Sequence, residues 1–286
     1  MSGIRIPMKN PSKLAREFAE TGRLSSISII DMHTHMGPFY GAYLPEASLE
    51  SMIGTMDREN IEWIISAPHS ALFDPIAGNE EIVQAMTKYP DRIYGYCTIN
   101  PNYADSPEKY LDAFDQSDGF VGFKFLPDYH KYPLNGDKYR PFYEFANERN
   151  LLLLSHTWGH SPYNPPQMIA DLARRYDSIT FLLGHSAPGE CDYAIEIAAS
   201  LPNVYLDLCD THRLSGMVRK MVRAASSEKV LFGTDYPWYD PHYGLGSVLF
   251  SGIDDDDISN IIHHNAVRLL NGVMKSRNGK GWKRNE

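Results

Sequence analysis

Short apolar runs alternate with amphipathic stretches of helix length along most of the chain, beginning after Ser25. Eight apolar runs occur. Most are continuous rather than alternating, and several are rich in β-branched or aromatic residues. Strands of a parallel sheet that is covered on both faces have this composition. The pattern therefore predicts eight buried strands, within residues 26–35, 61–69, 92–100, 119–127, 151–157, 179–187, 203–210 and 229–237.

The stretches between these runs predict eight helices. Ser48 and Asn79 are the expected N-caps of the first two, and Ser106 caps a third that has proline at its first helical position. The aspartate run 254–257 indicates an acidic start to the last helix, which complements the helix dipole, rather than a calcium site. The helices are expected within residues 48–60, 78–89, 106–117, 139–150, 165–176, 191–200, 215–227 and 254–271.

Eight strands that alternate with eight helices indicate an α/β fold, the (β/α)8 TIM barrel. The chain of 286 residues contains no internal repeat, low-complexity linker or break in composition, so we expect a single domain over residues 1–286. Within it, residues 1–24 are expected to form an N-terminal helical extension. Residues 276–286 are expected to form a loose basic tail.

Composition narrows the class of protein. Hydrophobic residues make up 43% of the chain and charged residues 22%, as in ordinary globular proteins with a large core. The net charge of −9 argues against nucleic acid as a partner, because phosphate binding requires clustered lysine and arginine. Cys97, Cys191 and Cys209 lie far apart and form no C-x-x-C pair, which indicates reduced thiols.

The chain also lacks signals for a membrane. No apolar run approaches the roughly 18 residues that a membrane span requires. Residues 1–22 lack the apolar centre of a signal peptide. These features predict a cytoplasmic protein with no membrane partner.

Polar residues end several of the predicted strands. Active sites of TIM barrels lie at the carboxyl ends of the strands, so residues that are distant in sequence meet at one mouth. The first strand ends in two histidines, and the fourth carries a lysine. The residues expected at this mouth are His33, His35, Lys124, His156, His185 and Asp235.

The residue types in this set favour a metal site. His33 and His35 lie two residues apart on a strand and so face the same side, where both can bind one ion. Imidazoles suit zinc, iron, cobalt or nickel, and Asp235 adds a carboxylate ligand. Taken singly, a strand-end histidine is more often only hydrogen-bonded, Lys124 is more often ion-paired, and Asp235 could cap a turn. Four histidines and an aspartate at one mouth favour the metal.

Residues in the loops are candidates for contact with a substrate. His130 follows the fourth strand and His160 follows the fifth, and either could touch substrate or a second metal. Aromatic residues are dense in the same loops and suggest a pocket for a ring or an apolar chain. These are Phe39, Tyr40, Tyr43, Trp158, Tyr163, Tyr236 and Trp238.

As a set, the motifs resemble the amidohydrolase superfamily. They resemble most its amidohydrolase-related branch, which includes aminocarboxymuconate-semialdehyde decarboxylase and several lactonases. The matching pieces are DMHTH on the first strand, GFKF on the fourth, LSHT on the fifth, LGHS on the sixth and FGTDYPW on the eighth, with HHNAVRLLN near the end. The resemblance covers about residues 28 to 272. It is specific for the superfamily and weak for any one reaction.

The resemblance implies the ligands. It places one divalent ion on His33, His35, His156 and Asp235, with zinc the expected ion and manganese, iron, cobalt or nickel as alternatives. His185 corresponds to a histidine that binds a second ion in two-metal members and acts as acid, base or electrophile in one-metal members. Lys124 stands where two-metal members carry a carboxylated bridging lysine. Because lysine at this place often does not bridge in this branch, we expect one metal.

Three functions are consistent with these residues. The first is hydrolysis of a small lactone, amide or ester-like substrate by a metal-activated water, with Asp235 as general base and His185 as acid or electrophile. The alternative is non-oxidative decarboxylation of a small unsaturated or aromatic carboxylic acid. That reaction needs positively charged side chains that bind the substrate carboxylates. The loop 66–78 has no lysine or arginine, so the candidates for this role are Lys124, Lys131, Arg140 and Arg213. The third is a barrel that binds a ligand without catalysis. The expected partners are a small-molecule substrate and a second copy in a homodimer.

Overall fold

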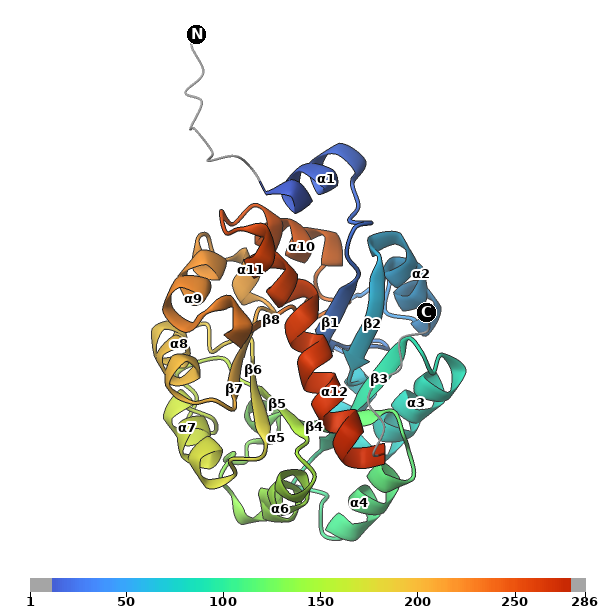
Figure 1. Cartoon of the computed structure of the whole chain (residues 1–286). Coiled ribbons are helices and arrows are strands. Elements are labelled where there is room, and N and C mark those ends of the chain that lie inside the picture. The colour runs from blue at the N-terminus through green and yellow to red at the C-terminus, as the bar shows by residue number, and fades with distance from the viewer. Residues whose placement is uncertain (1–11, 279–286) are drawn as a thin grey trace.

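The computed structural model describes residues 12–278. It contains one sheet of eight parallel strands, whose order around the barrel is their order along the chain (Figure 1). Each predicted apolar run contributes one strand. The TIM-barrel prediction is therefore confirmed. The strands are β1 (Ile29–Thr34), β2 (Ile61–Ser66), β3 (Ile93–Ile99), β4 (Phe120–Phe125), β5 (Leu152–His156), β6 (Thr180–Gly184), β7 (Val204–Asp207) and β8 (Val230–Leu231).

The barrel closes between β1 and the segment that follows β8. The Asp235 N–H donates to the His33 carbonyl at 2.9 Å, and the His35 N–H donates to the Tyr236 carbonyl at 2.6 Å. The regular strand is shorter here than the predicted run of residues 229–237, although the chain beyond Leu231 stays bonded to β1. These backbone bonds bring the two histidines of β1 beside Asp235.

Helices surround the sheet on its outer side, as predicted (Figure 1). Shorter helices and single turns fill several loops. The outer layer includes α2 (Leu49–Glu59), α3 (Pro75–Lys88), α4 (Pro107–Asp115), α6 (Arg140–Glu148), α7 (Pro166–Arg175), α8 (Cys191–Ser200) and α9 (Met217–Ala225), whereas α12 (Asn265–Asn278) crosses one end of the barrel. The additional elements are α1 (Lys13–Thr21), α5 (Pro127–His130), α10 (Pro241–Leu249), α11 (Asp255–Ser259), and the turns η1 (His69–Leu72), η2 (Asp137–Tyr139), η3 (Thr211–Arg213), η4 (Ser227–Lys229) and η5 (Asn260–His264).

The cap expected at Ser48 and the acidic helix start expected at the aspartate run are confirmed, while Ser106 precedes α4 without a side-chain cap bond. The Ser48 hydroxyl accepts the Ser51 N–H at 3.1 Å and so begins α2. At the aspartate run, Asp254 caps α11 and the next three aspartates occupy its first turn, where negative charge stabilises the helix dipole. The helix predicted over 254–271 is divided by η5, a π-helical segment.

Asn79 is not a helix cap, and this prediction was wrong. Helix α3 begins four residues earlier, where Asp74 accepts the first free backbone N–H groups. The buried Asn79 instead joins α3 to β3, because its Nδ2 donates to the Thr98 carbonyl at 2.9 Å and its Oδ1 accepts the Thr98 N–H at 2.8 Å. The sequence alone does not show whether an asparagine side chain caps its own helix or bonds to a neighbouring strand, since in both cases it forms hydrogen bonds with backbone groups.

Helix α12 covers the amino-terminal ends of the strands (Figure 1). Its Asn265 side chain donates to the carbonyl of Val230, the first residue of β8, at 2.8 Å. At its other end, Arg277 donates to the carbonyl of Phe120, the first residue of β4. One end of the barrel is thereby closed, and the carboxyl ends of the strands form the open mouth.

The chain termini were predicted as an extension and a tail. Helix α1 lies within the predicted extension, and its first N–H groups bond to the Asp255 carboxylate at 3.0 and 3.1 Å. Residues 1–11 lie outside the described part of the chain, as do residues 279–286 of the expected tail, while residues 276–278 belong to α12. No helix among residues 12–278 is long and apolar enough to cross a membrane. The cytoplasmic location stays a prediction.

The bond between α3 and β3 gives a test of the fold. Asn79→Ala leaves the buried N–H and carbonyl of Thr98 without partners, at a cost of about 1–3 kcal/mol for each such group. We expect the free energy of unfolding, measured with urea, to fall by about 2–4 kcal/mol. Glu80→Ala is the matched control, because Glu80 is exposed on the same helix, and it should change stability by less than about 0.5 kcal/mol. Equal effects of the two variants would contradict this account.

Candidate metal centre

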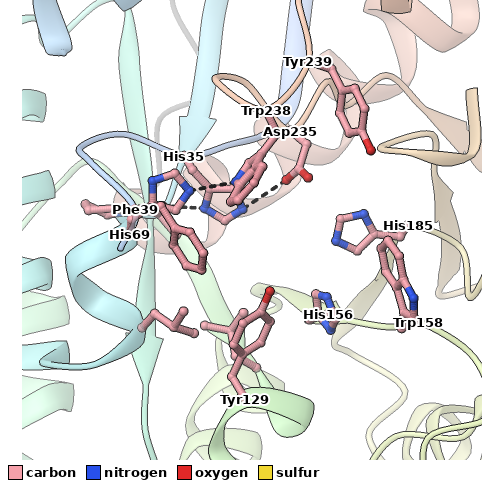
Figure 2. Close-up of a pocket in the computed structure, with 14 residues that line it drawn as sticks. His35, Phe39, His69, Tyr129, His156, Trp158, His185, Asp235, Trp238 and Tyr239 are labelled. Carbon is pink, nitrogen blue, oxygen red and sulfur yellow. Dashed lines mark hydrogen bonds and ion pairs between the residues drawn. The ribbon is translucent and has the colours of Figure 1, made fainter. Parts of the chain in front are cut away.

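A cavity of about 270 Å³ opens at the mouth of the barrel (Figure 2). Aromatic and aliphatic side chains form most of its wall, and histidines and one aspartate form the polar part. The lining residues are His35, Phe39, Ala67, Pro68, His69, Leu72, Leu126, Tyr129, His156, Trp158, His185, Asp235, Trp238 and Tyr239.

His33 lies just beneath this cavity, near the end of β1. Its Nδ1–H donates to Oδ2 of Asp207, the last residue of β7, at 2.5 Å. Both side chains are buried, and burial raises the pKa of the Asp207 carboxyl to about 6. Because Asp207 holds the Nδ1 proton, the His33 Nε2 presents a lone pair on the side of Asp235, 3.7 Å from its Oδ1.

His35 and His156 are fixed in the same tautomer by other acceptors. The His35 Nδ1–H donates to the Ala67 carbonyl at 2.7 Å, and the His156 Nδ1–H donates to the Asp128 carboxylate at 3.0 Å. In each case Nε2 is left as the basic nitrogen. Histidines that bind metals are oriented in this way, with one nitrogen held by a carbonyl or carboxylate and the other free for the ion.

Burial favours the neutral form of His33 and His156. It lowers the pKa of His33 well below its ordinary value, and the neighbouring Lys124 acts in the same direction. The pKa of His156 is also lowered by burial, although the Asp128 carboxylate opposes the shift. Neutral imidazole is the form that can bind a metal, so these two histidines suit an ion near neutral pH.

Asp235 and His185 complete the polar floor, and both have backbone φ angles in the left-handed region, 63° and 68°. Burial would raise the pKa of Asp235, but the surrounding imidazoles, that of His185 first, hold it well below its usual range. The buried Asp235 Oδ1 and His185 Nδ1 have no hydrogen-bond partner among the described residues. Figure 2 shows the two side chains on adjacent parts of the cavity wall.

The facing atoms at this floor lie close together. The His35 Nε2 lies 3.2 Å from the Asp235 Oδ1, and the His33 Nε2 lies 3.7 Å from the same oxygen. Three imidazoles and one carboxylate are ligand types that suit zinc, manganese or another first-row ion. The donor atoms that lie within 4.8 Å of one another among the described residues are, however, those of His33, His185, Cys209 and Asp235, a group without His35 and His156. The set of His33, His35, His156 and Asp235 therefore stays a prediction.

Lys124 lies at the bottom of the site on β4 and is completely buried. Its Nζ donates to the His33 Nε2 at 2.7 Å. Burial lowers the pKa of Lys124 to about 8, against the opposing effect of Asp235. The ammonium therefore occupies the lone pair that an ion would use, and it partly offsets the buried carboxylates of Asp207 and Asp235.

The other two candidate histidines lie away from this floor. His130 is buried beside a second chamber that shares Leu72, Tyr129, His156 and Trp158 with the first. Its Nε2–H donates to the Leu72 carbonyl at 3.0 Å. His160 is exposed and does not line the cavity. The structure thus gathers the six strand-end residues, places His130 one chamber away and leaves His160 outside.

Sequence reasoning missed Asp207, Asp128 and Cys209. Asp207 ends the seventh apolar run, so the strand-end rule that found the histidines would also have found it. Asp128 stands on α5 and bonds to Asn164 and Ser161 as well as to His156, and nothing in its local sequence indicates that role. Cys209 lies within 4.8 Å of ligand atoms of His33, His185 and Asp235, although its spacing from other cysteines suggested only a reduced thiol.

Comparison with protein families gives one match over most of the chain. The sequence profile of a family described as amidohydrolase matches residues 30–272, which contain every residue of the polar floor. No sequence among curated proteins matches the chain significantly.

Solved structures give further likenesses. An uncharacterised TIM-barrel protein from Bordetella bronchiseptica is 20% identical, with a TM-score of 0.70 over 86% of this chain and 99% of that one. 2,6-Dihydroxybenzoate decarboxylase from Rhizobium is 16% identical, with a TM-score of 0.67 over 85% and 98%. 5-Carboxyvanillate decarboxylase from Novosphingobium aromaticivorans, complexed with manganese and a nitrobenzoic acid, is 15% identical, with a TM-score of 0.66 over 85% and 96%. At these identities the likeness shows the fold.

The ligand set predicts which histidine binds the ion. His35→Ala should weaken binding of manganese at least about a hundredfold, because losing a direct ligand weakens binding more than losing a residue that orients a ligand. Calorimetric titration of the metal-free protein measures this. His69→Ala is the matched control: the His69 ring is stacked on His35 at 5.0 Å, but its Nε2 already accepts the Trp238 N–H at 2.9 Å. Comparable losses in both variants would show that the ion is not where we place it.

The partner of His156 gives a second prediction. Asp128→Asn should reduce metal affinity about ten- to a hundredfold, since the carboxylate orients His156 and increases its basicity. Ser161→Ala is the control, because it removes only a hydroxyl donor to the same carboxylate. Unchanged affinity in the Asp128 variant would mean that His156 is not a ligand.

Proposed function

The chain belongs to the amidohydrolase family, and on that premise we propose that it is a metal-dependent, non-oxidative decarboxylase of small aromatic carboxylic acids. The observation that carries the proposal is the composition of the cavity wall. Phe39, Trp158 and Trp238 are among the side chains around a polar floor that fits a divalent ion (Figure 2).

The wall indicates how a substrate would be held. Among the described residues that line the cavity, none is lysine or arginine, and Asp235 brings negative charge. A carboxylate can be retained there only by the cation at the floor, while the flat ring packs against aromatic side chains. A single carboxylate next to a ring therefore suits the cavity.

The positions of the four positively charged residues that were candidates for binding substrate carboxylates support a monocarboxylic substrate. Lys124 lies at the floor, below the place proposed for the substrate ring. Arg140 pairs with Glu144 on the exposed side of α6, and the Arg213 Nε is bonded to Asp210 at 2.7 Å. Lys131 lines only the second chamber. None of these four side chains is thus placed to hold a second carboxylate inside the first cavity.

The apolar walls of the cavity also favour decarboxylation. When bound, the ion supplies positive charge that holds the substrate carboxylate and offsets negative charge as the reaction proceeds. In decarboxylation the bond between the ring carbon and the carboxylate breaks, carbon dioxide leaves, and the electron pair stays on the ring carbon. The apolar residues around it exclude water from the reacting group, which favours the dispersed charge of the transition state over the compact charge of the carboxylate.

A proton must then reach the ring carbon. Asp235 lines the cavity and is ionised, so it can take a proton from solvent or from a substrate hydroxyl and deliver it. His185 lies beside it, neutral because burial lowers its pKa well below the ordinary value. We assign Asp235 as the proton carrier and His185 as the residue that positions and polarises the substrate.

Likeness in fold to two decarboxylases of aromatic acids supports this reaction over hydrolysis, which the residues alone had favoured. Hydrolysis stays the second candidate because of one observation. An ionised Asp235 beside a neutral His185 also supplies the base and the electrophile that attack by water requires. Manganese in one of these relatives supports manganese as well as the expected zinc for this chain.

A substrate screen separates the two reactions. The protein loaded with manganese or zinc is incubated with hydroxybenzoic acids, including 2,6-dihydroxybenzoate, and with small lactones and amides. Carbon dioxide release and acid production are measured in parallel. We expect release of carbon dioxide from at least one aromatic acid without acid production from lactones. Acid production alone would favour hydrolysis.

Removal of the proton carrier should abolish turnover. Asp235→Asn keeps the shape of the side chain but removes its charge, and we expect turnover to fall at least about a hundredfold. Asp240→Asn is the control, because Asp240 caps α10 outside the cavity and an asparagine caps equally well. Metal content of both variants is measured beside turnover. An Asp235 variant that turns over substrate at the normal rate would overturn the assignment.

A further inference from the structure

Cys209 is a completely buried thiol next to the metal centre, and the proposed reaction gives it no role. It follows the end of β7 by two residues. Its backbone N–H donates to the Asp207 Oδ1 at 3.3 Å, and the other oxygen of this carboxylate holds His33. One side chain therefore places the thiol and the imidazole on the same part of the barrel interior.

The thiol belongs to a compact group of ligand atoms. One ligand atom each of His33, His185, Cys209 and Asp235 lies within 4.8 Å of all the others. In tetrahedral zinc sites with such ligands the separation between donors is about 3.5 Å, so an ion would draw this group together by roughly 1 Å.

Two members of the group have buried polar atoms without a partner. These are Nδ1 of His185, a residue that is more than nine-tenths buried, and Oδ1 of Asp235, whose side chain is 12% exposed. Buried polar atoms in proteins are nearly always bonded, so such exceptions point to a missing ion or ligand. The unsatisfied atoms and the thiol thus mark one position below the cavity floor.

We propose that Cys209 completes a second ligand set, with His33, His185 and Asp235, which takes thiophilic ions such as zinc and cadmium. The first set, in contact with the cavity, consists of His33, His35, His156 and Asp235. It has only nitrogen and oxygen ligands and therefore suits manganese. Thiolates select soft ions, whereas carboxylates and imidazoles accept harder ones. Because His33 and Asp235 belong to both sets, a single ion is bound at a time, and its softness decides the position.

Binding at the deeper position requires a proton to leave. The thiol S–H bond breaks, the proton passes to solvent, and the sulfur donates its electron pair to the ion. Manganese in the upper set involves no such ionisation. Cadmium should therefore release one proton more per ion from the normal protein than from a Cys209→Ser variant. This inference concerns ion binding alone and holds for either candidate reaction.

The test is titration of the metal-free, full-length protein with cadmium and, separately, with manganese. With cadmium we expect a thiolate-to-metal charge-transfer band in the ultraviolet. Cys209→Ser should lose the band and bind cadmium about a hundredfold more weakly, while its affinity for manganese changes by less than about threefold. Retained manganese binding shows that the variant is folded, and Cys209→Ala replaces it if the serine variant does not fold.

Cys191→Ser is the matched control, because Cys191 is the thiol at the start of α8, away from the ligand group. It should keep the charge-transfer band, the cadmium affinity and the extra proton release. A normal protein without the band, or a band and affinity that survive Cys209→Ser, would overturn the proposal. Either result would leave decarboxylation untouched, since that reaction is tested by release of carbon dioxide and not by cadmium binding.

Discussion

Three residues of the metal centre are held by one buried carboxylate, that of Asp207. Its oxygens accept the His33 Nδ1–H at 2.5 Å and the backbone N–H groups of His185 and Cys209, both at 3.3 Å. The first contact selects the tautomer of His33 and so leaves Nε2 for an ion. The bonds to the backbone N–H groups of His185 and Cys209 fix the loops after β6 and β7. The positions of the remaining ligands depend on this arrangement, because His35 and Asp235 are placed relative to His33 by the closure of the barrel.

Electrostatics explain why a cation would suit this site. Asp207 and Asp235 are both buried, and Lys124 is the completely buried ammonium beside them. Buried charges are stable only when they are paired or bind a metal. An ion at the floor would offset the negative charge of the two carboxylates, and it would give a cavity with apolar walls its means of holding a carboxylate.

The sequence contained most of the site but few of the contacts that support it. His33, His35, His156, His185 and Asp235 could be predicted because parallel strands in a barrel bring their carboxyl ends to one mouth. The pairing of His33 with Asp207 joins residues 174 positions apart, and its partner could be found only from the fold. Local patterns also misplaced Asn79, whose amide bonds to β3 across the packed interface rather than to its own helix. The metal, the reaction and a homodimer stay predictions because they depend on groups outside the chain.

The central claim is that His33, His35, His156 and Asp235 bind one divalent ion at the floor of an aromatic cavity. Anomalous X-ray diffraction from crystals of the manganese-loaded protein tests it most directly. The account predicts one strong anomalous peak, with the Nε2 atoms of the three histidines and an Asp235 oxygen at about 2.0–2.2 Å. An ion bound elsewhere, or two ions bridged by a carboxylated Lys124, would contradict it.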